Sequence, residues 1–281
     1  MRTVAITLAV ILWLVITMAV IFQLPQGQEG DPAFLVGIVF VLLAFTLVAA
    51  ILGIIKLFNK IHALPEDKRR YMAFGSVPIM ANGESIDRFK NYTHKPRAIR
   101  YSLQQHWGIQ NHGDATAAAH TLSQAQFHAP FADDVYHNLI KKGLTVADFG
   151  PALGSLQDKH ASQIDRIKQA LVCYDKAKQG LIRTGYTEEE LDQIPSLAAW
   201  DYGRTAFIAR FGSNAGLMTQ DEAWPYIKAA ADNASPIYAD WRQYLAAYIL
   251  GQAVGANQMS ALGRRIIGEK SHLARIPFKG E

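Results

Sequence analysis

The sequence predicts an all-α protein, with a two-helix transmembrane hairpin followed by a single multi-helix cytoplasmic domain. Three observations predict this class. Two uncharged apolar runs lie near the N-terminus, at residues 3–24 and 34–55. Helix start and stop signals follow one another from residue 96 onward. No segment shows the alternation of apolar and polar residues that is typical of a strand.

The two apolar runs predict a membrane hairpin. Each run has 22 residues and as a helix would reach about 33 Å, enough for the hydrocarbon core of a bilayer. The loop between them carries Glu29 and Asp31 but no basic residue, so both termini are expected on the cytoplasmic side of a bacterial inner membrane. Two alternatives stay open: a cleaved signal peptide for the first run, and a pair of buried core helices.

The chain is expected to divide into three parts. Residues 1–58 form the hairpin, 59–95 a connector near the membrane surface, and 96–281 the helical domain. The expected partners are the lipid bilayer and a protein of unknown identity. Basic residues follow the second run, where they contact anionic lipid or merely set topology: Lys56, Lys60, Lys68, Arg69 and Arg70. No nucleic-acid motif is present, so no nucleic-acid partner is expected.

Local signals place the helices of the domain. The predicted helices with their boundary signals are Pro96–Trp107 ended by Gly108, an alanine-rich helix capped by Asp114 and ending near Gln126, residues 132–142 ended by Gly143, and residues 162–179 ended by Gly180. Capping boxes stand at 187–190 and 219–222. Ser196 is expected to cap a helix to Phe211, and Ser235 with Pro236 to open a helix to about Ala253.

The most specific motif of the domain is Trp200-Asp201-Tyr202-Gly203-Arg204. On a helix, Asp201 and Arg204 share one otherwise apolar face and lie three residues apart, so they can form an ion pair. An unpaired buried charge is costly, which leaves two interpretations. The pair fixes the helix structurally, or Arg204 binds an anionic or carbonyl group that Asp201 orients.

Two further tryptophans are candidate binding residues together with that motif. Trp224 follows a capping box, and Trp241 lies on the apolar stripe of the last predicted helix, where Gly251 permits close helix approach. Core packing explains all three tryptophans, and an aromatic cleft around Arg204 is the functional alternative. The candidate binding set is therefore Trp200, Asp201, Arg204, Trp224 and Trp241.

These residues also carry a resemblance. Trp200-Asp201-x-x-Arg204, Gly216 with Glu222-Ala223-Trp224, then Trp241 and Gly251, resemble in their order a bacterial family known as domain of unknown function 1266. Trp107-Gly108-Ile109 fits the start of that domain, so the resemblance covers roughly Tyr101 to Ala253. It implies an α-helical domain and assigns no catalytic residue; the hairpin is expected to be an addition to it.

No metal, cofactor or catalytic set is predicted. The clustered histidines are not spaced three or four apart on one helix face, so they are interpreted as independent residues: His106, His112, His120, His128 and His137. The single cysteine, Cys173, cannot form an internal disulfide and is expected to be a structural thiol.

One function is predicted on this basis, and two alternatives stay open. The first is a membrane-anchored adaptor or regulatory binding protein, with an immunity-type inhibitor of a toxin as one subclass, because tryptophan and arginine often dominate interfaces. The second is an enzyme or small-molecule-binding protein with an unfamiliar site at Asp201 and Arg204, which requires a concave pocket there. The third is a purely structural membrane component.

Overall fold

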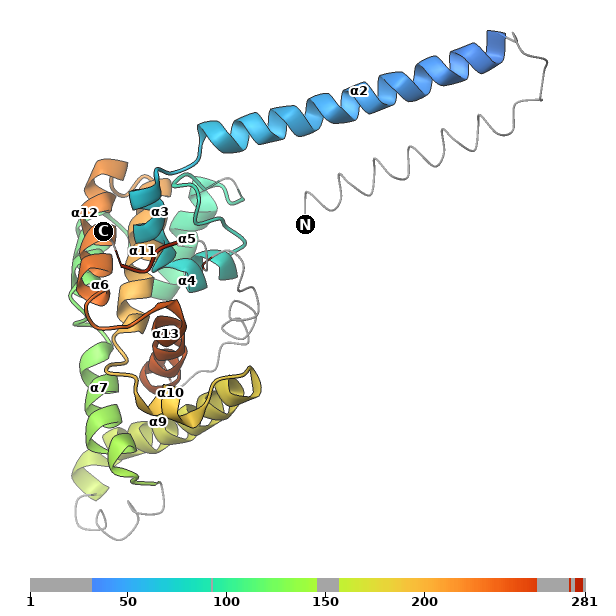
Figure 1. Cartoon of the computed structure of the whole chain (residues 1–281). Coiled ribbons are helices and arrows are strands. Elements are labelled where there is room, and N and C mark those ends of the chain that lie inside the picture. The colour runs from blue at the N-terminus through green and yellow to red at the C-terminus, as the bar shows by residue number, and fades with distance from the viewer. Residues whose placement is uncertain (1–31, 92, 146–156, 257–272, 274–275, 280–281) are drawn as a thin grey trace. The chain divides into compact units, whose positions relative to one another are not determined.

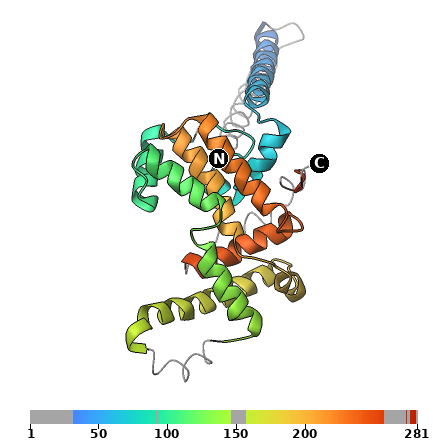
Figure 2. The same cartoon turned by 90° about the vertical axis from the view of Figure 1, so that its left-hand side faces the viewer.

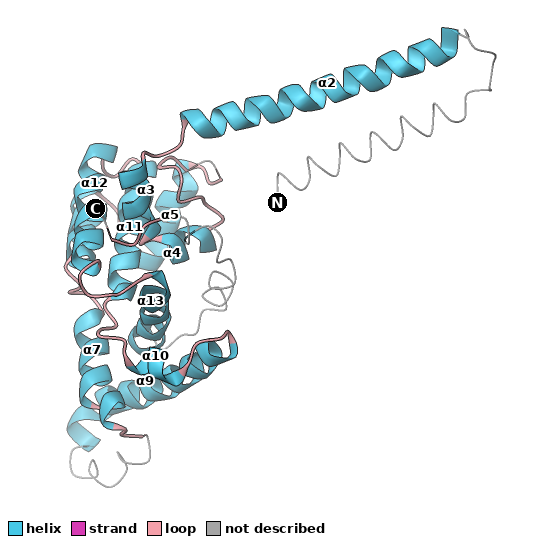
Figure 3. Ribbon diagram, in the orientation of Figure 1, coloured by secondary structure: helices cyan, strands magenta, loops and turns pink. Residues whose placement is uncertain are grey.

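The computed structural model describes residues 32–91, 93–145, 157–256, 273 and 276–279. It divides into two compact units, Met1–Ala63 and Leu64–Glu281. All regular elements formed by the described residues are helices, and Figure 3 draws no strand among them. The predicted all-α class is therefore confirmed for this part of the chain.

In the first unit the described residues form one helix, α2 (Pro32–Ile61). The first predicted span, 3–24, lies outside the described residues, and the second lies within α2, which continues through Lys56 and Lys60. Crossing a bilayer takes about 20 consecutive apolar residues in one helix. No helix formed by the described residues combines the length and the apolar character that crossing requires. The predicted location as a multi-pass inner-membrane protein with cytoplasmic termini is therefore wrong, and the hairpin is not supported.

The second unit packs a set of helices around one core (Figure 1). Its N-terminal helices occupy part of the segment that was expected to be a connector, and bury Met72, Phe74 and Ile79 in that core. The helices are α3 (Glu66–Ala73), α4 (Ser76–Ala81), α5 (Pro96–Trp107), α6 (His112–Ser123), α7 (Ala129–Asn138), η1 (Ile140–Lys142), α9 (Gln157–Arg183), α10 (Glu188–Asp192), α11 (Ala199–Asn214), α12 (Gln220–Ala234) and α13 (Trp241–Ala256).

Helix α11 is the central element of this unit. It packs against α4, α5, α6, α12 and α13, while α13 also contacts α7, α9 and α10 (Figures 1 and 2). Every residue of α11 from Ala199 to Gly212 is buried, so the helix has no solvent-facing side there, unlike the single buried stripe expected. A Cβ on Gly203 would lie 2.6 Å from the Tyr248 ring of α13. Glycine therefore allows α11 and α13 to cross closely.

Several helix boundaries agree with the predictions from local chemistry. Helix α5 spans the predicted Pro96–Trp107 and ends at Gly108, whose φ of 66° favours glycine. Thr187 and Thr219 both form capping boxes, with Glu190 and Glu222 as the reciprocal partners. These signals act within one helical turn, so they can be read from neighbouring residues alone.

Other boundaries differ because a competing residue satisfies the helix end. Asn111 caps α6, and Asp114 is the third residue of its capping box instead of the cap. Helix α7 begins at Ala129 and ends at Asn138, and only the short helix η1 reaches Gly143. Helix α9 begins at Gln157 and continues through Gly180 to Arg183, because an isolated glycine costs only about 1 kcal/mol inside a helix.

The predicted starts of the last helices are corrected in the same way. Helix α11 begins after Ala198, and the Ser196 hydroxyl accepts the Ala198 N–H at 3.0 Å. Ser235 ends α12 instead of opening α13, and its hydroxyl donates to Ala231 O at 2.7 Å. Helix α13 begins six residues later, where Asp240 Oδ1 accepts the Gln243 N–H at 2.8 Å.

Candidate functional site

Asp201 lies at the centre of the candidate site and is fully buried in α11. Its Oδ2 accepts the backbone N–H groups of Phe127, His128 and Ala129 at 3.0, 2.9 and 3.1 Å. These N–H groups belong to the first residue of α7 and the two residues before it, and the N-cap residue His128 forms no side-chain cap. A carboxylate is favourable at the positive end of a helix. Asp201 therefore supplies the missing cap from another helix.

Arg204 completes the network on the same face of α11. Its Nη2 donates to Asp201 Oδ1 at 2.5 Å and to His128 Nδ1 at 2.8 Å, and its Nε donates to Trp200 O at 3.3 Å. The side chain of Arg204 is only 8% exposed. The predicted Asp201–Arg204 contact therefore exists and is buried.

Aromatic rings surround the Arg204 guanidinium. Its central carbon lies 3.6, 5.2 and 5.5 Å from the ring centroids of Trp200, Trp107 and Phe127. The rings of Phe127, His128 and Trp200 follow one another with centroid separations of 4.5 and 4.3 Å. A guanidinium over ring faces gains cation–π attraction, and more so where water is excluded.

His128 is held neutral in this network. Burial, followed by the nearby Arg204 charge, lowers the pKa of His128 from 6.5 to about 4, against the opposing influence of Asp201. Arginine only donates, so Nδ1 accepts its hydrogen bond and the neutral ring carries its proton on Nε2. Burial also lowers the pKa of Arg204, although Asp201 counteracts this effect.

The network leads from the core to the surface. Trp200 is 6% exposed, Trp107 is partly buried, and Phe127 is 54% exposed. We call the three residues Trp107, Phe127 and His128 the aromatic cap, because they lie over Arg204 on its solvent side. The site therefore consists of a buried charged network with an exposed apolar ring above it.

The other two predicted tryptophans lie elsewhere. Trp224 is buried against Phe89, with ring centroids 5.1 Å apart, and the Lys68 ammonium lies 5.0 Å from its ring. Trp241 packs against Phe74 at 4.8 Å. Among the described residues, the Arg204 guanidinium contacts the rings of Trp107, Phe127 and Trp200 but neither Trp224 nor Trp241, so the predicted candidate set divides between separate clusters.

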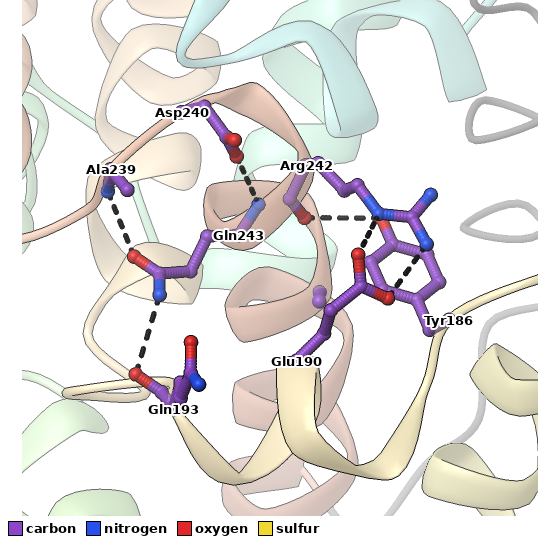
Figure 4. A pocket seen from close by; sticks show the side chains of 8 residues that line it. Tyr186, Glu190, Gln193, Ala239, Asp240, Arg242 and Gln243 are labelled. Atoms are coloured by element: carbon purple, nitrogen blue, oxygen red, sulfur yellow. Dashed lines mark hydrogen bonds and ion pairs between the residues drawn. The ribbon is translucent and has the colours of Figure 1, made fainter.

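A shallow pocket of about 140 Å³ lies between α10 and the N-terminal end of α13, and none of the predicted site residues lines it (Figure 4). Arg242 forms two hydrogen bonds with Glu190, at 2.7 and 2.8 Å, and its guanidinium stacks 3.9 Å from the Tyr186 ring centroid. The Arg242 hydrogen bonds lower the pKa of Glu190 to about 2. Small-molecule sites typically measure about 300–1,000 Å³, so this pocket suits only a small group.

Sequence reasoning missed a second buried ion pair and part of the first network. Arg210 of α11 is fully buried, donates to Phe89 O at 2.8 Å and pairs with Glu84 at 3.2 Å. His128 was interpreted as an independent residue, but it binds Arg204. Pro130 in the first turn of α7 is a sequence signal for a helix start, and no neighbouring side chain caps that start. No local pattern, however, identifies the distant carboxylate that accepts the free N–H groups there.

Metal binding finds no support among the described residues, where no group of three or more His, Cys, Asp or Glu side chains has suitable geometry. His112 instead pairs with Glu222 at 3.0 Å, linking α6 to the capping box of α12. Hydrogen bonds from Thr219 and His112 lower the pKa of Glu222 to about 2. Cys173 is a free, partly buried thiol on α9.

Comparison with known proteins identifies the family but no close relative. No curated protein and no solved structure is detectably similar to the chain. Residues 102–264 match the family described as "Protein of unknown function (DUF1266)". This match covers more than half of the 281 residues and includes the aromatic cap and its charged network. The chain therefore belongs to the DUF1266 family.

Proposed function

We propose that this protein is an adaptor or regulatory protein that binds another protein through the aromatic cap. The observation that carries the proposal is the way Phe127 is presented. The residue is 54% exposed, while its backbone N–H is fixed by a fully buried carboxylate. Exposed aromatic rings held rigidly are typical anchors of protein interfaces, because little conformational entropy is lost when they bind.

The charged network supports a positioning role. Asp201 uses one oxygen for three backbone N–H groups and the other for Arg204, and Arg204 donates to His128 and Trp200 as well. A catalytic pair needs atoms that can reach a substrate. Here the polar atoms already serve the fold, which supports binding through the rings above them over catalysis by the pair.

The proposal can be tested by placing a photoreactive residue at the cap. Phe127 is replaced by p-benzoylphenylalanine in the full-length chain, which is expressed in its native cells and irradiated. The matched control carries the same residue at Tyr101, an aromatic position of α5 that is 64% exposed. We expect one discrete adduct from position 127, identified by mass spectrometry, and none of the same protein from position 101.

The partner is then purified and its affinity measured. Phe127→Ala should weaken binding on the order of tenfold or more, whereas Tyr101→Ala should change it by less than about twofold. Circular dichroism confirms that both variants are folded. The proposal fails if position 127 gives no adduct, or if both positions give the same set of adducts.

A further inference from the structure

The last described residues pack against the rest of the second unit in a way that the aromatic cap does not explain. Leu273 and Ile276–Lys279 are the last described residues, and we call them the strap. Leu273, Ile276 and Phe278 are 6%, 4% and 8% exposed, although only Leu273 is assigned to a helix. The burial of three apolar side chains in so short a segment requires a receiving surface on the rest of the unit.

Aromatic side chains form that surface, and Figure 1 draws the backbone of the strap in red. The Phe278 ring centroid lies 4.8 Å from Trp241, 5.3 Å from Phe74 and 6.2 Å from Tyr244. Trp241 and Phe278 meet edge to face, with an interplanar angle of 89°. This geometry is favourable for aromatic pairs beyond simple burial. We call the surface of Arg70, Phe74, Trp241 and Tyr244 the strap groove.

The strap groove also contacts the backbone of the strap. Trp241 Nε1 donates to Ile276 O at 2.7 Å, and Arg70 Nη1 donates to Phe278 O at 3.2 Å. Pro277 lies between the two accepting residues, and its ring restricts φ, which lowers the entropy lost on docking. Two backbone contacts around one buried aromatic ring are how grooves recognise an extended peptide.

We propose that the strap groove is a peptide-binding site and that the strap is its built-in occupant. It accepts an extended segment with an aliphatic residue, proline and phenylalanine in succession. Trp241 and Tyr244 lie inside the matched family region, whereas Arg70, Phe74 and the strap lie in the flanks outside 102–264. The groove is therefore formed partly by the flank before the family domain and partly by the family domain itself. The strap, from the flank after the family domain, controls access to it.

The strap can be released because few polar contacts hold it, so that its docking depends on its buried apolar side chains. Between described residues, two hydrogen bonds join it to the rest of the unit, and no ion pair does. Lys279 is exposed, and Phe278 is the largest buried side chain of the strap. Removing the Phe278 ring should therefore open the groove, while removing the Lys279 side chain should leave it closed.

The test uses the full-length chain and a fluorescent synthetic peptide of residues 273–281. Fluorescence anisotropy measures binding of this peptide to the wild type, to Phe278→Ala and to the matched control Lys279→Ala. We expect Phe278→Ala to bind the peptide one-to-one, on the order of tenfold more tightly than the other two proteins, whose own strap competes. A peptide carrying the Phe278→Ala change should not bind the opened groove.

Two outcomes overturn the proposal. One is a folded Phe278→Ala chain that binds the peptide no better than the wild type. The other is equal binding of the wild-type and altered peptides. If Phe278→Ala does not fold, the proposal is tested with a chain that ends at His272 and therefore lacks the strap. Adding the wild-type peptide should restore the helical circular dichroism of this chain, and adding the altered peptide should not. Failure of both peptides to do so also refutes the proposal. This result is independent of any partner at Phe127.

Discussion

Replacing Asp201 by asparagine should destabilise the protein far more than removing its ion-pair partner. The Asp201 side chain is fully buried and serves both the N-terminus of α7 and Arg204. Asparagine offers one oxygen in place of two. Its amide group must face either the N–H donors of α7 or the guanidinium of Arg204, and both are donors. Every orientation therefore leaves a buried group without its partner.

The magnitude follows from what remains buried. Breaking a buried ion pair typically costs about 3–5 kcal/mol, because the surviving charge stays uncompensated. Arg204→Met removes the other partner, but Asp201 then keeps three backbone donors that stabilise its charge. We expect Asp201→Asn to lower the free energy of unfolding by about 3–5 kcal/mol, and Arg204→Met by about 1–3 kcal/mol.

Urea unfolding at neutral pH, followed by circular dichroism, measures both variants against the wild type. The double variant Asp201→Asn with Arg204→Met should be more stable than the sum of the two losses predicts, because the asparagine no longer faces a buried cation. The reasoning is refuted if Asp201→Asn costs less than about 1 kcal/mol, or if Arg204→Met costs more than Asp201→Asn.

Three further predictions concern pH, packing and the second ion pair. From the ordinary histidine value of 6.5 down to about 4, the unfolded chain binds a proton at His128 that the folded chain does not. The free energy of unfolding should therefore fall by up to about 3 kcal/mol as pH decreases through this range, and His128→Gln should flatten that part of the profile. Gly251→Ala places a Cβ 2.4 Å from a backbone oxygen and should cost about 1–3 kcal/mol in urea unfolding. A Cβ at Gly180 would meet nothing within 4 Å, so Gly180→Ala should raise the free energy of unfolding by up to about 1 kcal/mol. A loss of stability in both glycine variants would contradict the packing argument. Glu84→Gln leaves the fully buried Arg210 without its carboxylate and should cost at least about 3 kcal/mol, and a neutral effect would show that the pair is dispensable.

The aromatic cap and the strap groove are two separate candidate binding surfaces of the second unit. The cap presents a rigid exposed ring above a saturated charged network, whereas the strap groove presents buried rings that the chain itself covers. A partner at the cap needs no rearrangement of the strap. A peptide at the groove must displace it. The two tests therefore address different surfaces and can succeed or fail separately.

The sequence by itself determined the features that depend on neighbouring residues. The all-α class, the limits of α5, the two threonine capping boxes and the contact between Asp201 and Arg204 all follow from groups within four residues of one another. The close approach at Gly251 was also predicted, because only a residue without a side chain permits it. Local geometry is the same in any context, so such patterns can be read without a fold.

Only the tertiary structure decided what lies around those local features. The backbone N–H groups of Phe127, His128 and Ala129 reach Asp201 across more than 70 residues of sequence, and Glu84 reaches Arg210 across 126. Tertiary packing also buried α11 on all sides and divided the predicted tryptophans between separate clusters. A buried charge must find a partner, but chain folding alone determines which distant group supplies it. Local sequence therefore predicts that a charge needs a partner, and the assembled core determines which residue that partner is.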